Sequence, residues 1–196
     1  MIVIVDPDRQ MLDSIVKSLN DAGENAQSAI QQALNDTLKT LKNDWHSGVR
    51  ADYTIRAGSF RKSDIKTKNA TRSRLIASAT VRGPVLSAYA NYKRYKNTVH
   101  KAARLQVKRD AAAKALQLGT GYKAFVATMS NGHTGIFQRV PGTQMKKKKN
   151  KEKIKEIIAM SAAKAAEKTY ERRLKEETQD HLRLALLRHM NRALAG

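Results

Sequence analysis

Residues 124–142 read AFVATMSNGHTGIFQRVPG and give the strongest local indication of structure in the chain. The runs 124–129 and 135–140, on either side of Asn131-Gly132, are rich in apolar residues with polar ones among them. Such runs are typical of β-strands, and Asn-Gly between two strands favours a tight turn, because both residues tolerate positive φ angles. The stretch therefore predicts a β-hairpin.

Two upstream segments, 75–81 and 99–107, also contain apolar and polar residues in the mixture typical of strands. Downstream of the hairpin comes a run of basic side chains that is extended by two more lysines: Lys146, Lys147, Lys148, Lys149, Lys151 and Lys153. Such a run is not buried in a protein core, so it indicates a loop or a hairpin tip. We expect a small antiparallel sheet with basic outer faces in 49–145 and a lysine-rich loop in 146–153.

Helical periodicity marks the two ends of the chain. Met1–Val5 predicts a short strand, and Asp6-Pro7 then opens a helix that Gly23 ends. A second helix is expected from Glu24 to Trp45, with Gly48 closing it. Its apolar stripe contains Ala26, Ala29, Ile30, Ala33, Leu34, Thr37, Leu38 and Leu41.

A third, long helix is predicted from Ser161, which can cap it, to Leu194. One face contains Ala166, Tyr170, Leu174, Leu182, Ala185, Leu186 and Met190, and further leucines lie beside it at 184, 187 and 194. A surface helix of a small domain needs only one buried face. The surplus predicts a subunit interface formed by Leu182, Leu184, Leu187 and Met190.

Together these segments predict an α+β fold in which two N-terminal helices and a long C-terminal helix pack on a small antiparallel sheet. We expect one domain over 1–196, with the strand and first helices in 1–48 and the C-terminal helix in 154–196. The 196 residues include no cysteine, which excludes disulfides and thiolate metal sites and suits a reducing cytoplasm. Met1–Val5 is too short for a signal peptide or a membrane span.

The formal net charge is +21, and the excess lies in the middle of the chain. A charge of this size predicts a polyanionic or acidic partner. We expect the electrostatic surface to be formed by Arg72, Arg74, Lys93, Arg94 and the four lysines Lys146, Lys147, Lys148 and Lys149. Tyr89, Tyr92 and Tyr95 between basic residues could stack on bases or simply pack on the sheet.

Catalytic residues are not indicated by the sequence. His133 has no second histidine at ligand spacing, and no carboxylate lies between Ala111 and Asn150, so a turn histidine is the favoured interpretation. His181 and His189 lie two turns apart on the last predicted helix, where we expect exposed or interfacial positions. We expect no enzyme activity, no metal and no cofactor.

The hairpin resembles the core motif of the phage minor tail protein Z family, whose members are tail completion proteins of long-tailed bacteriophages. The matching positions are Ala124, Phe125, Val126, Asn131, Gly132, Gly135, Phe137, Arg139 and Gly142. Ala33-Leu34-Asn35 resembles the family's Ala-Leu-Asn helix, and Lys68-Asn69-Ala70-Thr71 its basic Ala-Thr segment. The chain departs from the family in 157–161, where members often carry a proline.

This resemblance implies a structural virion protein of the neck and proximal tail, assembled in the host cytoplasm. Such a protein joins the head-proximal end of the tail to the tail terminator and the head–tail connector, as a ring of copies close to the end of the packaged DNA. No membrane partner is expected. The alternative is a cytosolic, sequence-independent nucleic-acid-binding protein of ribosomal or nucleoid type, which the pI of about 10.4 would suit.

Overall fold

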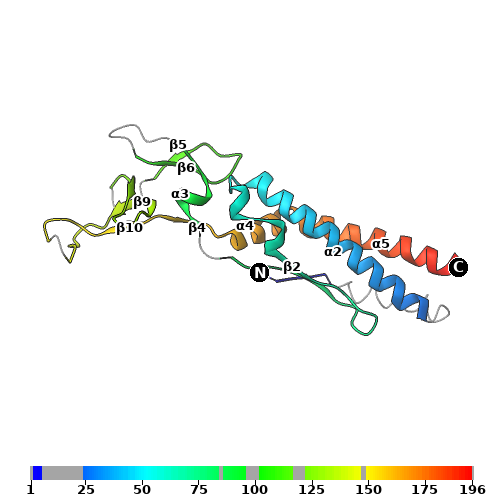
Figure 1. Cartoon of the computed structure of the whole chain (residues 1–196). Helices are drawn as coiled ribbons and strands as arrows, with labels where there is room; N and C mark the ends of the chain where they lie inside the picture. Colours follow the sequence, from blue (N-terminus) through cyan, green and yellow to red (C-terminus); the bar gives the residue numbers. More distant parts are fainter. Residues whose placement is uncertain are drawn as a thin grey trace. The chain divides into compact units, whose positions relative to one another are not determined.

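The computed structural model describes residues 2–5, 24–83, 86–95, 102–116, 122–146 and 149–195, and its fold is α+β as expected (Figure 1). By its internal contacts the chain divides into two compact units. Unit 1 contains Met1–Gly48, Arg61–Arg82 and Ala166–Gly196, and unit 2 contains Val49–Phe60 and Gly83–Ala165.

Helix α2 runs from Glu24 to Asp52 and contains the whole predicted apolar stripe on its buried side. The helix does not end at Gly48 as expected. A Cβ atom at Gly48 would lie 3.0 Å from Thr169 Cγ2, so this glycine permits close helix packing instead of ending the helix. The helix predicted between Pro7 and Gly23 lies outside the described residues, so the described part of the N-terminal region contains one helix.

The long C-terminal helix is confirmed. It begins with α4 (Ala162–Thr169), passes through a π-helical turn, η3 (Tyr170–Leu174), and continues as α5 (Lys175–Ala195). The Ser161 hydroxyl accepts a hydrogen bond from the backbone N–H of Lys164 at 3.1 Å, which is the predicted N-cap.

Within unit 1, α2 and the C-terminal helix lie side by side and antiparallel (Figure 1). Trp45 Nε1 donates to the Ala166 carbonyl at 2.7 Å, and the Trp45 ring contacts the Tyr170 ring with centroids 5.7 Å apart. Nine residues earlier in α2, Asp36 Oδ2 contacts His189 Nε2 at 2.8 Å. Because the later residue of one helix meets the earlier residues of the other, the two helices run in opposite directions.

Four small antiparallel sheets replace the single sheet that was expected. Unit 1 contains the sheet β1-β3-β2, and unit 2 contains β10-β9-β8, β11-β4 and β5-β6-β7. The strands of unit 1 are β1 (Ile2–Val5), β2 (Ile65–Lys68) and β3 (Ala77–Val81). Those of unit 2 are β4 (Leu86–Ser87), β5 (Lys93–Tyr95), β6 (Arg104–Gln106), β7 (Lys114–Ala115), β8 (Phe125–Thr128), β9 (Thr134–Arg139), β10 (Ile154–Glu156) and β11 (Ile158–Ala159).

Short helical turns complete the fold: η1 (Ala57–Ser59) and α3 (Ala88–Asn91) in unit 2, and η2 (Lys62–Asp64) in unit 1. Strand β3 shows the alternation expected of a sheet with one covered face, because Ala77, Ala79 and Val81 are fully buried. Strand β1 pairs with β3 along its whole length, from Ile2 opposite Thr80 to Val5 opposite Ala77, which confirms the predicted N-terminal strand.

Candidate assembly surfaces

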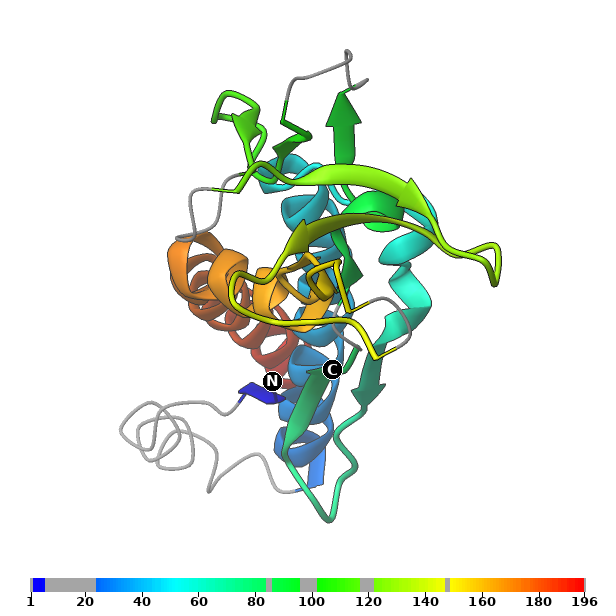
Figure 2. The same ribbon diagram turned by 90° about the vertical axis from the view of Figure 1, so that its left-hand side faces the viewer.

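The predicted hairpin is confirmed as β8 and β9, paired from Phe125 opposite Phe137 to Thr128 opposite Thr134 (Figure 2). Its turn is closed by the Gly132 N–H, which donates to the Met129 carbonyl at 2.9 Å. Gly132 has a φ of 80°, a conformation that glycine adopts without steric cost. The turn is therefore a three-residue loop with glycine in the left-handed region.

Three of the other motif positions contact one another or the neighbouring strands. The Arg139 guanidinium lies 5.9 Å from the centre of the Phe125 ring, within reach of a cation–π interaction. Ala124 is buried, and its backbone joins the hairpin to β6 and β7: its N–H donates to Leu116, and its carbonyl accepts from Ala103. Gly142 has a φ of 70°, so the turn after β9 also favours glycine there.

Gly135 is explained by a side chain that the sequence analysis did not select, Glu156 of β10. A Cβ atom at Gly135 would lie 2.8 Å from Glu156 Oε1 and 3.0 Å from the Phe137 ring. The carboxylate is held in place from two sides, because Ser87 Oγ donates to Oε1 at 2.7 Å and His133 Nε2 lies 3.0 Å from Oε2. His133 is thus a turn residue bound to Glu156.

The two upstream stretches of the resemblance meet in unit 1. Asn35 on α2 forms a pair of hydrogen bonds with the backbone of Ala70: the Ala70 N–H donates to Oδ1 at 2.8 Å, and Nδ2 donates to the carbonyl at 3.2 Å. Gln31 Nε2 donates to the same carbonyl at 3.2 Å. The Ala-Leu-Asn helix therefore binds the Ala-Thr segment through the side chain of its asparagine.

Helix α5 has an apolar surface on the side that faces away from the core. Leu184, Leu187 and Leu194 are 64%, 53% and 62% exposed. The buried side of the same helix is formed by Thr178, Leu182, Ala185, Leu186 and His189. Successive helical residues are rotated by about 100°, which places the three exposed leucines opposite these buried side chains. We call the three exposed leucines the leucine surface.

The other two residues expected at a subunit interface lie elsewhere. Leu182 is 4% exposed and belongs to the core of unit 1, and Met190 is half-buried. His189 is buried against Asp36, contrary to the exposed or interfacial position expected for it, whereas His181 is exposed. The Arg188 guanidinium also contacts Asp36, at 2.7 Å.

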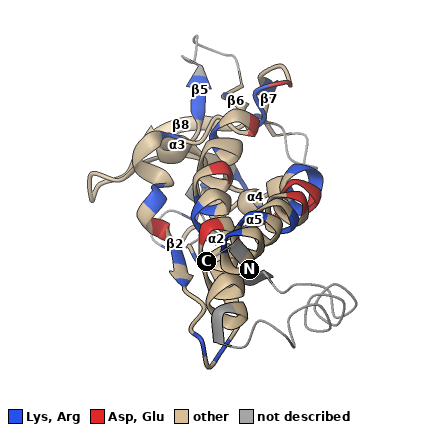
Figure 3. Cartoon of the chain, turned by 90° about the vertical axis from the view of Figure 1, so that its right-hand side faces the viewer, with Lys and Arg blue, Asp and Glu red and all other residues tan. Residues whose placement is uncertain are grey.

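The predicted basic residues are divided between the two units. Arg72 and Arg74 lie in an exposed turn of unit 1, whereas Lys93 and Arg94 lie on β5 of unit 2. The Arg94 guanidinium lies over the Tyr89 ring, 3.9 Å from its centre. Figure 3 shows β5 and β2 as blue, basic segments, and α5 with both signs of charge.

The lysine run follows β9 in unit 2. Lys146 and Lys149 are exposed, and Lys147 and Lys148 lie outside the described residues. The two ends of the run belong to a second hairpin, because the Met145 N–H donates to the Lys151 carbonyl at 2.8 Å and β9 pairs with β10. This agrees with the loop or hairpin tip that the sequence predicts.

Unit 2 carries most of the positive charge. It contains 20 of the 38 Lys and Arg residues but only 4 of the 17 Asp and Glu residues, which gives a formal charge of +16 against +5 for unit 1. Tyr92, one of the aromatic residues near the basic stretch, packs within this unit. Tyr92 is buried and donates to the Met160 carbonyl at 2.6 Å, and burial, with a smaller effect of Tyr53, raises its pKa.

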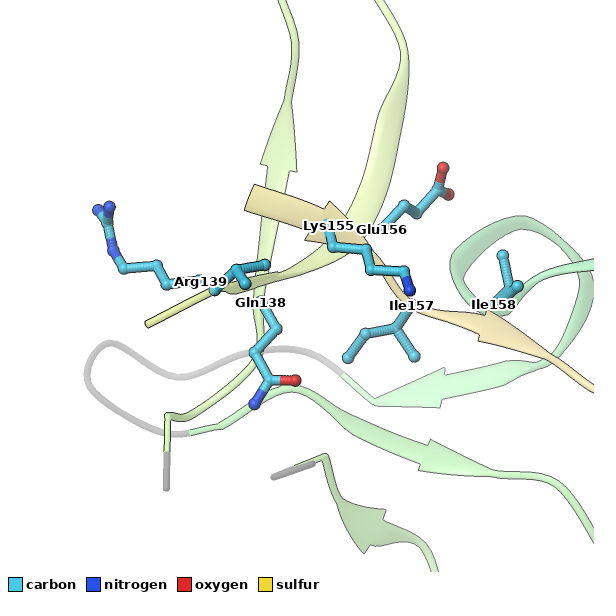
Figure 4. Close-up of a pocket in the computed structure, with 7 residues that line it drawn as sticks. Gln138, Arg139, Lys155, Glu156, Ile157 and Ile158 are labelled. Carbon is cyan, nitrogen blue, oxygen red and sulfur yellow. The ribbon is translucent and has the colours of Figure 1, made fainter. Parts of the chain in front are cut away.

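An apolar cavity of about 350 Å³ lies beside β9 and β10 (Figure 4). It is lined by the apolar Val140, Ile157 and Ile158 and by the polar or charged Gln138, Arg139, Lys155 and Glu156. In the part of the chain that the structure describes, no group of three His, Cys, Asp or Glu side chains converges as metal ligands would. No helix among the described residues is both long and apolar enough to cross a membrane.

Comparison with protein-family models, with curated proteins and with solved structures finds no match to this chain.

Proposed function

We propose that this chain is a structural protein of the phage neck and proximal tail, a tail completion protein that binds further copies of itself. In this role it joins the head-proximal end of the tail to the tail terminator and the head–tail connector, as a ring of copies. The proposal combines the resemblance of residues 124–142 to the minor tail protein Z family with the leucine surface of α5.

The observation that carries the proposal is the leucine surface. Burying an exposed leucine contributes about 1–2 kcal/mol, so three leucines on one helix face favour association with another apolar surface. Charges of both signs lie along the same helix: Glu177, Asp180 and Arg183 precede Leu184, and Arg192 lies between Leu187 and Leu194. A second copy of the same chain can therefore supply both the apolar partner and the complementary charges.

The proposal is further supported by what the positions that match the family do in this chain. Gly132 and Gly142 hold positive φ angles, Gly135 leaves room for a carboxylate, and Asn35 binds the backbone of Ala70. Each of these positions has a physical need for its residue type. A motif of that kind specifies a particular hairpin and the contacts that hold it. A shared hydrophobic pattern alone would not require these residue types.

Analytical ultracentrifugation of the full-length protein tests self-association. Leu187→Asp is expected to shift the protein to monomer with unchanged helical content, because Leu187 is exposed. Gln179→Asp, an exposed position elsewhere on α5, is the matched control and should assemble like the parent. Equal assembly by the parent and Leu187→Asp would contradict this role of α5.

The position of the protein in the phage particle needs a separate test. Immunogold labelling of phage particles from the strain that encodes the chain is expected to mark the head-proximal end of the tail. Label on cellular nucleic acid, and none on particles, would instead support a nucleic-acid-binding protein of ribosomal or nucleoid type.

A further inference from the structure

The segment from Lys151 to Glu156 in unit 2 has a strictly alternating pattern of exposure. Lys151, Lys153 and Lys155 are exposed, and the residues between them are half-buried. The segment is extended: Lys153 accepts a backbone hydrogen bond from Val140, and β10 continues the pairing with β9. In an extended strand every second side chain points to the same face, so the three lysines form a row with a spacing of about 6.7 Å.

An open groove of about 950 Å³ lies along part of this lysine row (Lys151, Lys153 and Lys155). Lys151 and Lys153 line it together with Lys146, and Met129 and Met145 supply apolar contacts. Among its lining residues, all of them described, the only charged side chains are these three lysines. The groove therefore concentrates positive charge next to a surface that a bulky ligand can contact.

The lysines of the row are not neutralised by neighbouring carboxylates. Within the part of the chain that the structure describes, no ion pair includes Lys151, Lys153 or Lys155. The two acidic residues of the same segment have other partners: Glu156 is held by Ser87 and His133, and Glu152 accepts a hydrogen bond from Tyr122 at 3.3 Å. The row thus adds uncompensated charge to a unit that already carries +16.

We infer that the lysine row binds the phosphodiester backbone of duplex DNA. A linear row of cations at regular spacing matches a linear polyanion with one charge per nucleotide. Lysine ammoniums contact phosphates as point charges, so the binding is independent of sequence. The site lies in unit 2, uses no residue of α5 and goes beyond the proposed role in self-association.

The test measures binding of the full-length protein to a fluorescent duplex of about 30 base pairs by anisotropy, between about 50 and 200 mM NaCl. The row variant carries Lys151→Gln, Lys153→Gln and Lys155→Gln. The control variant carries Lys62→Gln, Lys66→Gln and Lys68→Gln, three exposed cations of unit 1, so both variants lose the same charge. Circular dichroism checks that both remain folded.

Each lost phosphate contact lowers the slope of log K against log [salt] by about 0.9, so the row variant should lose about 2–3 units of slope and bind more than about tenfold more weakly at low salt. The control should keep its slope within about one unit. Equal weakening of both variants would overturn the inference, because net charge alone would then explain binding. Displacement of the duplex by polyglutamate as efficiently as by unlabelled duplex would also overturn it.

Failure of this inference and failure of the proposed function can be told apart. Loss of DNA binding in the row variant tests only the lysine row, because it does not depend on the oligomeric state. Dissociation of Leu187→Asp tests only self-association, because it does not depend on the affinity for DNA. Sedimentation of the row variant, expected to match the parent, keeps the two results separate.

Discussion

The Glu156 carboxylate determines which residue can occupy the middle of β9. It lies against the Cα atom of Gly135 while Ser87 and His133 bind its two oxygens. Ser87 lies on β4 and His133 lies in the turn of the β8–β9 hairpin, so the Glu156 side chain joins its own strand, β10, to two other segments of unit 2. A small residue at 135 is therefore a packing requirement, separate from the turn glycines.

Gly135→Ala is expected to destabilise unit 2 by about 1–3 kcal/mol, because the new methyl group would displace either the Glu156 carboxylate or the Phe137 ring. Chemical denaturation followed by circular dichroism measures the change. Gly58→Ala is the control, since a Cβ atom there has no neighbour within 4 Å, and it should leave the free energy of unfolding within about 0.5 kcal/mol. Equal effects of the two substitutions would contradict the packing role of Gly135.

Residue identity alone could predict the glycines of the turns but not the role of Glu156. Asn131-Gly132 is a local signal, because the turn geometry depends on adjacent residues. Glu156 is 69 residues from Ser87 and 23 residues from His133, so its function depends on which strands become neighbours. The alternation of Lys151, Lys153 and Lys155 is visible in the sequence, but the sequence analysis assigns the first two lysines to the loop 146–153 and Lys155 to the helical segment 154–196, whereas Ile154–Glu156 forms β10.

At the scale of elements, the antiparallel pair of α2 and the C-terminal helix is joined by Trp45. Its indole N–H donates to the Ala166 carbonyl, and the helix adopts its π-helical turn from Tyr170 onward, four residues later. In an α-helix the Ala166 carbonyl would accept from the N–H of residue 170. The hydrogen bond from Trp45 to this carbonyl therefore coincides with the change from α-helix to π-helical turn.

Trp45→Phe is expected to lower the free energy of unfolding by about 1–3 kcal/mol, because it leaves a buried carbonyl without its donor and reduces packing volume. Circular dichroism during urea unfolding measures the loss. Trp45 is the only tryptophan in the chain, so the variant also loses the fluorescence signal of the parent. His46→Phe, at a half-buried position on the same turn, provides a comparison that should change stability less.

The helices were predicted well because their signal is local. The stripe of α2 recurs every three or four residues, and each predicted member is buried. The extension past Gly48 was missed because that glycine faces Thr169, more than a hundred residues away. The number of sheets was also missed, since the alternation of a strand indicates which face is covered but does not identify the neighbouring strand.

At the scale of the whole molecule, charge is distributed unequally between the two units. Unit 2 carries +16 and unit 1 carries +5. Repulsion between like charges destabilises a compact unit and weakens when salt screens it. The lysines that cause the repulsion are also those that would attract a polyanion. The same charges therefore favour binding and lower the intrinsic stability of unit 2.

The melting temperature of the protein should therefore rise with ionic strength. We expect an increase of about 2–4 °C between roughly 20 and 300 mM NaCl, equivalent to about 1 kcal/mol. Differential scanning calorimetry measures it. The row variant should show a smaller rise, because three of the repelling charges are absent. A melting temperature that falls with salt would mean that attractive ion pairs outweigh repulsion.

The division of the chain has a consequence for its synthesis. Unit 1 is built from three separated segments, the last of which is Ala166–Gly196, and unit 2 lies mostly between the second and the third. On the ribosome, the residues of unit 2 are therefore complete before the last segment of unit 1 is made. Until then, the apolar side of α2 has no C-terminal helix to pack against. Truncated products would present that side to chaperones and proteases, so the cell can degrade incomplete copies.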